Sequence, residues 1–193
     1  MVSEHIRRHA RNLVPDRGNV DADTKVALFS RQIQETHATL EYVATTDDVP
    51  GAITRYLSGK NLPAKVVLAP ALAKLPWNEQ PLLETKVGAT RGEDAVAVTG
   101  AFAAIAETGT LLLTSGAESP QTLHLLPEHH VVVVRRDQVV GSMEDCWDRL
   151  RAQGPLPRTA MFVSGPSSTA DIELTHYLGA HGPRRLHVIV VDR

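Results

Sequence analysis

Cysteine is almost missing from this chain of 193 residues, and its scarcity excludes several kinds of site. Cys146 is the single thiol, so no disulfide can form within the chain. Cysteine-ligated iron–sulfur clusters and structural zinc sites need several ligands of this type, and we expect neither here. A cluster of that kind would have to belong to a partner protein, and the sequence leaves any other cofactor unknown. Cys146 lies in a helical pattern after Ser142, which predicts a buried packing role.

Long apolar runs are also absent. Runs such as 131–134 and 188–191 are four residues long, whereas a membrane-spanning helix needs about 20. We therefore expect no membrane partner. The first residues carry arginine and histidine without the apolar stretch of a secretory signal, which predicts a cytoplasmic location.

An excess of charge of either sign is missing too. The formal net charge is −2, and the 15 arginines and 5 lysines are spread along the chain, with only short pairs of neighbours. A nucleic-acid-binding surface gathers its basic residues, so we expect no nucleic-acid partner. The composition, with 42% hydrophobic and 22% charged residues, is typical of one globular domain.

The residue pattern alternates between helix and strand. A basic helical stretch at 3–13, followed by Pro15 and Gly18, indicates that residues 1–20 form a loosely ordered arm before a domain at 21–193. Strands are expected at 39–43, 65–69, 83–87, 96–99, 103–107, 110–114, 131–134, 138–140, 160–163 and 187–191. Helices are expected to begin near Asp21 or Asp23, near Asp48, near Ser142 and near Ser168. This order predicts an α/β fold with one sheet of mixed direction.

Residues 164–173 follow an apolar strand and precede a stretch with helical spacing. Gly165 and Pro166 can form a tight turn, and a hydroxyl among residues 167–169 can cap the helix. The free N–H groups of a first helical turn bind phosphate or carboxylate, so the segment suits an anion. The alternative is a capped helix with no ligand, since Ser168 and Asp171 have the spacing of a capping box.

A second segment places one carboxylate between two apolar strands. Glu107 lies in Ala106-Glu107-Thr108-Gly109-Thr110, at a glycine break. A carboxylate in apolar surroundings is costly unless it is hydrogen-bonded or used. Glu107 could be a nucleophile, a general base or an acceptor that holds a ligand. Its structural alternative is to accept N–H bonds across the Gly109 turn, and the pattern leaves both possibilities open.

Three motifs in this order resemble the LUD-domain proteins, specifically the lactate utilization protein C family. The motifs are Ala106 to Thr110, Leu125-Leu126-Pro127 with His130, and Ser164 to Glu173 followed by Gly182-Pro183. The resemblance runs from about Ala22 to the end of the chain. One departure is His129, which stands where the family more often has an apolar residue.

The resemblance implies a cytoplasmic protein that acts with two iron–sulfur proteins, lactate utilization proteins A and B, in the oxidation of L-lactate to pyruvate. It also implies a single Rossmann-like domain similar to the ribose-phosphate isomerase and CoA-transferase group. It implies no reaction for this chain itself, because no catalytic residues carry over from the family.

The hypothesis that leads is an accessory component of lactate oxidation that binds a small anionic ligand. The alternatives are a stand-alone acyl- or CoA-transfer enzyme that uses Glu107, and a non-catalytic regulatory scaffold, so the sequence leaves open whether the chain is an enzyme. The predicted ligand-binding residues are Thr108, Gly109, Thr110, His130, Ser164, Gly165, Ser167, Ser168 and Thr169, and the candidate catalytic residue is Glu107. His130 is expected to be structural or ligand-orienting, with no metal. We predict that loops 107–110 and 164–169 lie side by side at the carboxyl ends of adjacent strands.

Overall fold

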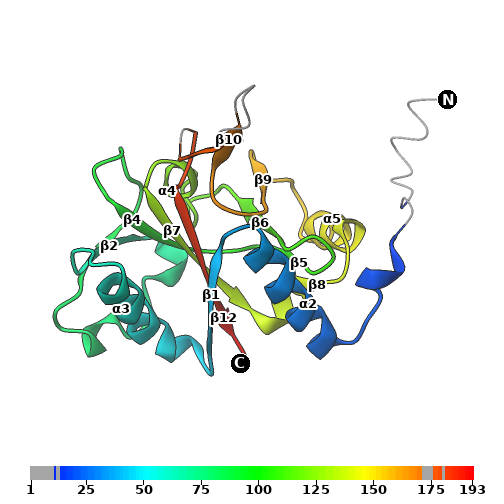
Figure 1. Ribbon diagram of the computed structural model, residues 1–193, viewed down its shortest axis with the longest axis horizontal. Helices are drawn as coiled ribbons and strands as arrows, with labels where there is room; N and C mark the ends of the chain where they lie inside the picture. The colour runs from blue at the N-terminus through cyan, green and yellow to red at the C-terminus, as the bar shows by residue number, and fades with distance from the viewer. Residues whose placement is uncertain (1–10, 12–13, 171–175, 180) are drawn as a thin grey trace.

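A six-stranded, wholly parallel β-sheet forms the centre of the molecule (Figure 1). The computed structural model describes residues 11, 14–170, 176–179 and 181–193, so the helix expected at 3–13 lies outside the described residues apart from Arg11. In spatial order the strands are β1 (Thr39–Val43), β12 (Arg185–Val191), β7 (His129–Arg135), β4 (Val96–Gly100), β2 (Lys65–Leu68) and β3 (Glu84–Val87).

The central strands are buried on both faces, which explains their unbroken apolar sequence. Helix α3 (Val49–Gly59) packs against one face, where it meets Val131 and Val133 of β7. Helix α2 (Ala22–Glu35) packs against the other, where it meets Val132 and Val134. Because side chains alternate along a strand, both sets of valines must be apolar.

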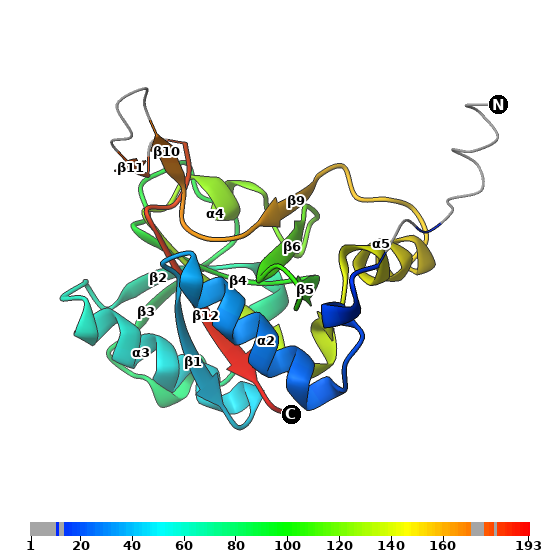
Figure 2. The same cartoon turned by 45° about the vertical axis from the view of Figure 1, so that its right-hand side comes forward.

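A second, four-stranded sheet lies beside α2. Its order is β8 (Val139–Val140), β5 (Ala103–Ile105), β6 (Thr110–Thr114) and β9 (Ala160–Val163). One face shares a core with α2 and the large sheet, and the other packs against α5 (Met143–Ala152). Figure 2 shows α2 across the front of the large sheet, with the second sheet beside it. Cys146 of α5 is fully buried in this outer layer, and burial raises the pKa of its thiol to about 12, as suits a packing residue.

The sequence predicts one sheet of mixed direction, whereas the structure divides the expected strands between two: a parallel six-stranded sheet and a mixed four-stranded sheet. The separation begins just after β4, where Ala101 N still donates to Val133 O in the large sheet at 3.0 Å. The next residue, Phe102, donates instead to Leu112 O of β6 at 2.9 Å. The chain thus leaves one sheet and enters the other within two residues. A sequence pattern predicts that a segment is extended but does not say which strand it pairs with.

The prediction that a helix begins at Ser168 is wrong. Residues there form β10 (Ser168–Ala170), which pairs antiparallel with β11 (His176–Leu178). The spacing of Ser168 and Asp171 is a local signal only, whereas Thr169 and Tyr177 are residue types that favour strands. Asp171 and the rest of the expected first helical turn up to residue 175 lie outside the described residues.

Short elements complete the described chain. They are α4 (Thr122–Leu125) and five 3-10 turns, at Asp16–Gly18, Thr46–Asp48, Pro70–Leu72, Trp77–Glu79 and Arg136–Gln138. Among the described residues, every helix is too short or too polar to cross a membrane.

Candidate functional site

The carboxylate of Glu107 lies at the amino-terminal end of α5. Its Oε1 accepts a hydrogen bond from Met143 N at 2.9 Å, and its own backbone N donates to Gly141 O at 3.1 Å. The side chain is 6% exposed, and Oε2 is buried without a partner among the described residues. Glu107 therefore bonds to the start of another element rather than across the Gly109 turn, and its charge lies at the positive end of the α5 dipole.

Hydroxyl groups connect the two loops that were expected to meet. Thr110 Oγ1 lies 2.7 Å from Thr108 Oγ1 and 2.7 Å from Ser164 Oγ. The loops are thus neighbours, but in the second sheet, where β5 and β9 both end beside the beginning of β6. The strands that end here are separated by β6, so they flank a shared neighbour instead of being adjacent.

Two glycines of these loops pack against the carboxyl-terminal end of α2. At Gly109, with φ of 61°, an added Cβ would lie 2.4 Å from Ile33 N. At Gly165, with φ of 149°, it would lie 2.6 Å from Thr36 Oγ1. Only glycine fits such close contact in this backbone region. These turns therefore hold the second sheet against α2, and Gly109 in particular faces protein rather than open space.

Four of the predicted ligand-binding residues share a pocket of about 210 Å³, here called the amino-edge pocket because β7 and β12 begin there. Its lining residues are His124, Leu125, His130, Met161, Phe162, Val163, Ser164, Gly165, Pro166, Ser167, His181, Gly182, Pro183 and Leu186. The predicted residues that it brings together are His130, Ser164, Gly165 and Ser167. Thr108, Gly109, Thr110, Ser168 and Thr169 do not line it.

Neutral imidazoles and hydroxyls supply the polarity of the amino-edge pocket. His130 Nε2 lies 2.8 Å from Thr99 Oγ1, and its ring stacks on His124 at 5.7 Å between centroids. Burial lowers the pKa of His130 to about 3 and that of His124 to about 4, so both are uncharged at pH 7. The lining contains no lysine or arginine. Because residues 168–170 form a strand, no helix begins at Ser168, and the described lining contains neither the arginine or lysine nor the helix start expected of an anion site.

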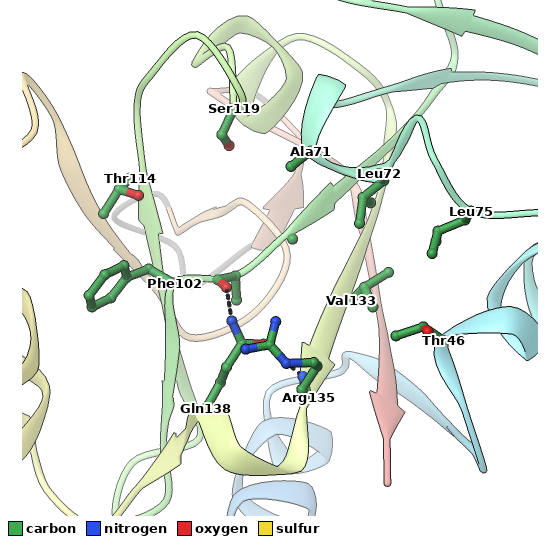
Figure 3. Close-up of a pocket in the computed structure, with 12 residues that line it drawn as sticks. Thr46, Ala71, Leu72, Leu75, Phe102, Thr114, Ser119, Val133, Arg135 and Gln138 are labelled. Carbon is green, nitrogen blue, oxygen red and sulfur yellow. Dashed lines mark hydrogen bonds between the residues drawn. The ribbon is translucent and has the colours of Figure 1, made fainter. Parts of the chain in front are cut away.

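A pocket of about 250 Å³ lies at the opposite edge of the large sheet, where β4 and β7 end. We call it the carboxyl-edge pocket. Thr46, Ala71, Leu72, Leu75, Gly100, Ala101, Phe102, Thr114, Ser119, Val133, Arg135 and Gln138 line it. In Figure 3 the side chains of Arg135 and Gln138 enter from one end, with Leu72 and Leu75 on one side and Phe102 on the other.

Our sequence reasoning missed the carboxyl-edge pocket, although a signal for it is present. Arg135 directly follows the buried run at 131–134. Ligands of open α/β sheets bind beyond the carboxyl ends of the strands, so an arginine in that position is a candidate ligand contact. Our prediction gave this place to the loop after β9, which lies instead at the edge where β7 and β12 begin.

No cluster of three or more histidine, cysteine, aspartate or glutamate residues suited to a metal occurs within the described part of the chain. Two of the three histidines that line the amino-edge pocket bond to hydroxyls: His124 Nε2 lies 3.0 Å from Ser119 Oγ, and His130 Nε2 lies 2.8 Å from Thr99 Oγ1. The described residues thus offer polar contacts for an organic ligand.

These features define an α/β protein built on a central parallel sheet. A family model for the LUD domain matches residues 26–191, and the chain belongs to this family. It is 36% identical to lactate utilization protein C from Deinococcus radiodurans over 173 residues, 84% of this chain and 77% of that protein. It is 34% identical to lactate utilization protein C from Shouchella clausii over 100 residues, 50% of this chain and 44% of that protein.

A solved structure has a similar fold. The crystal structure of a DUF162 family protein from Deinococcus radiodurans matches with a TM-score of 0.68 and 26% sequence identity, over 90% of this chain and 99% of that one. The LUD assignment and the α/β fold are thus confirmed. The finer likeness to ribose-phosphate isomerases and CoA-transferases stays a prediction.

Proposed function

We propose that this chain is an accessory component of cytoplasmic L-lactate oxidation to pyruvate, which acts with iron–sulfur partner proteins A and B and binds a small anionic ligand. The observation that carries the proposal is the 36% identity to lactate utilization protein C of Deinococcus radiodurans over 84% of this chain. The single cysteine supports the assignment of the clusters to the partners.

Within this function, the amino-edge pocket has a polar ligand-contacting role. His130, Ser164 and Ser167 provide an imidazole and two hydroxyls along one wall, and Gly165 positions the loop on α2. Such groups suit the uncharged oxygen atoms of a small organic molecule. Outside the pocket, Thr110 Oγ1 bonds both to Thr108 Oγ1 and to Ser164 Oγ of the lining. Gly109 packs against α2, and Ser168 and Thr169 belong to β10, which follows the lining loop.

The geometry of Glu107 favours this accessory role over acyl or CoA transfer. A carboxylate nucleophile must reach the acyl group of its substrate. Glu107 is 6% exposed, accepts a hydrogen bond from Met143 N and lines neither pocket described above. Hydroxylamine trapping tests the point directly: a transferase incubated with acyl-CoA forms a thioester at Glu107 that hydroxylamine converts to a hydroxamate, and we expect none.

The proposed function is tested by deleting the gene for this chain in its source organism. We expect growth on L-lactate as sole carbon source to stop, growth on pyruvate to continue, and the wild-type gene to restore growth on lactate. An affinity-tagged chain purified from lactate-grown cells should carry the iron–sulfur partners with it. Undiminished growth of the deletion strain on lactate would contradict the proposal.

A further inference from the structure

We propose that the carboxyl-edge pocket binds the carboxylate of a small monocarboxylic acid through the guanidinium group of Arg135. This gives the anionic ligand of the proposed function a place and a chemical class. It rests on that function only in the choice of lactate and pyruvate as probes. Three features support this assignment: the position of the pocket, the open end of the Arg135 guanidinium group and the chemistry of the pocket walls.

The pocket lies where parallel strands end. Gly100 is the last residue of β4 and Arg135 is the last residue of β7, and both line the pocket. The two strands are direct neighbours in the large sheet, with Gly100 paired to Val133. Both connections then enter the second sheet: after Gly100 the chain forms β5, and after Arg135 it passes through the turn at 136–138 into β8, which pairs in parallel with β5. The pocket thus lies beyond the carboxyl ends of two neighbouring parallel strands, which is the edge where open α/β sheets usually bind their ligands.

Arg135 is held at its base and along one side. Its backbone N donates to Gln138 Oε1 at 2.7 Å, and Gln138 Nε2 donates to Ala101 O at 2.7 Å. Its Nε and Nη2 donate to the two carboxylate oxygens of Asp137, at 3.1 Å and 3.3 Å. This pairing uses the side of the guanidinium, so the end formed by Nη1 and Nη2 keeps N–H groups for a second carboxylate in a two-bond arrangement.

The lining favours an anion with one charge. Arg135 is the single charged residue among those that line the pocket, and no carboxylate lines it. Asp137 already balances part of the arginine charge, so a dicarboxylate would bring a second charge without a partner. Monocarboxylates match this balance best.

The remaining walls set the size and shape of the acid. Leu72, Leu75, Phe102 and Val133 provide apolar contact for a short carbon chain, and Thr46 adds a hydroxyl. A volume of about 250 Å³ lies below the roughly 300–1,000 Å³ of sites for drug-sized ligands, so small acids suit it. A hydroxyl or keto group next to the carboxylate could bond to Thr46 while the methyl group packs on the leucines.

The test uses the purified full-length chain, titrated with sodium L-lactate and sodium pyruvate at constant ionic strength. Lactamide, which has the same shape as lactate without the charge, is the ligand control. We expect saturable binding of both acids and none of lactamide. Arg135→Gln should weaken binding at least tenfold. Arg55→Gln, which removes an exposed arginine paired with Glu41 outside the pocket, should leave binding unchanged.

A measurement on the wild-type protein keeps the test independent of the variant's folding. On addition of lactate, the NMR methyl signals of Leu72, Leu75 and Val133 should move, and those of Leu125 and Leu186 in the amino-edge pocket should stay in place. Movement of the second group alone, no saturable shift, or wild-type affinity of a folded Arg135→Gln protein would overturn the proposal. The growth experiment reports separately on the proposed function, because a chain that binds lactate can still be dispensable for growth.

Discussion

The carboxylate of Glu107 is buried, and its Oε2 atom has no hydrogen-bond partner in the described part of the chain. The contacts of the other oxygen, Oε1, explain the role of this residue. The Oε1 atom satisfies Met143 N, one of the N–H groups that a helix leaves without an internal partner at its start. Ser142 and Asp145 satisfy further groups of the same end through a capping box. Glu107 therefore joins the β5–β6 turn to α5, and this role explains why an acidic residue lies in an otherwise apolar segment.

Substitution of Glu107 separates this structural role from a catalytic one. Glu107→Ala removes the acceptor of Met143 N, so we expect the free energy of unfolding to fall by about 2 kcal/mol. Glu107→Gln keeps an oxygen acceptor, and we expect a smaller loss, about 1 kcal/mol, with growth on lactate retained. Chemical denaturation and growth assays measure both effects.

Glu118→Ala is the matched control, because its side chain is exposed and should change stability little. If Glu107→Gln is as stable as wild type and yet abolishes growth on lactate, then the charge of Glu107 is functional and the structural interpretation is wrong.

The sequence predicted those helices that have both a capping residue at their start and a regular row of apolar residues facing the core. Helix α2 begins where Asp21 accepts a hydrogen bond from Thr24 N at 2.9 Å, and α5 begins at the Ser142 capping box. Each also has a regular apolar face. The stretch after Ser168 has the capping signal without a sustained apolar face, and strand pairing prevails there. A capping signal alone is therefore weak evidence for a helix.

The sequence predicted the contacts of the candidate site only where the residues lie on, or directly after, strands that pair with each other. Thr110 and Ser164 meet because β6 lies between β5 and β9, and His130 joins Ser164 in the amino-edge pocket. Arg135 and Gln138 were missed because their partners in the carboxyl-edge pocket, such as Thr46, come from distant parts of the chain. Sequence patterns describe periodicity along one element, whereas a pocket depends on how several elements are packed.

Buried histidines in β7, β12 and α4 make stability depend on pH. Burial lowers the pKa of His130 to about 3, and those of His124 and His187 to about 4, from ordinary values of 6.5. Below pH 6.5 these histidines therefore bind protons in the unfolded chain but stay neutral in the folded chain. The free energy of unfolding should be highest above pH 6.5 and should fall as the pH is lowered from 6.5 toward 4. The slope is up to about 1.4 kcal/mol per pH unit for each histidine. Urea denaturation at a series of pH values measures it.

One histidine can be removed from this total with little change of shape. His187 stacks on Tyr56 at 4.4 Å, so His187→Phe keeps a ring in that place and removes the titrating nitrogens. The slope of stability with pH should fall by the share of one histidine. His37→Asn, at an exposed position with φ of 70°, is the control, because asparagine tolerates that backbone conformation. Equal slopes for His187→Phe and wild type would contradict the burial argument.

At the scale of the whole molecule, α2 belongs to the cores of both sheets. Val26, Phe29 and Ile33 share one apolar cluster with strands of the large sheet and of the second sheet. The two sheets are therefore joined by a common helix as well as by the chain, and the glycine turns at 109 and 165 add backbone contact at its end. We expect one cooperative unfolding transition rather than two.

Hydrogen exchange should reveal this organisation as a gradient across the large sheet. β12 is paired on both sides and its residues 188–191 are fully buried, whereas β3 is an edge strand with Val87 51% exposed. The amides of β12 should exchange at least tenfold more slowly than those of β3, a difference of about 1.4 kcal/mol in opening free energy. Exchange followed by NMR or mass spectrometry measures it. Similar rates in both strands would show that the sheet opens as one unit.

The position of β12 also sets a requirement on how the protein is assembled. β12 is the last strand in chain order, yet it lies between β1 and β7 and is the one strand that β1 pairs with in the sheet. While residues 185–191 are not yet made, β1 has no partner, and β7 has an open edge of unpaired backbone N–H and C=O groups flanked by apolar side chains. In a nascent chain, β1 therefore cannot pair within the large sheet until β12 has been synthesised. During that interval the open edge of β7 is a place for wrong pairing, and a chaperone that shields it would raise the yield of folded protein.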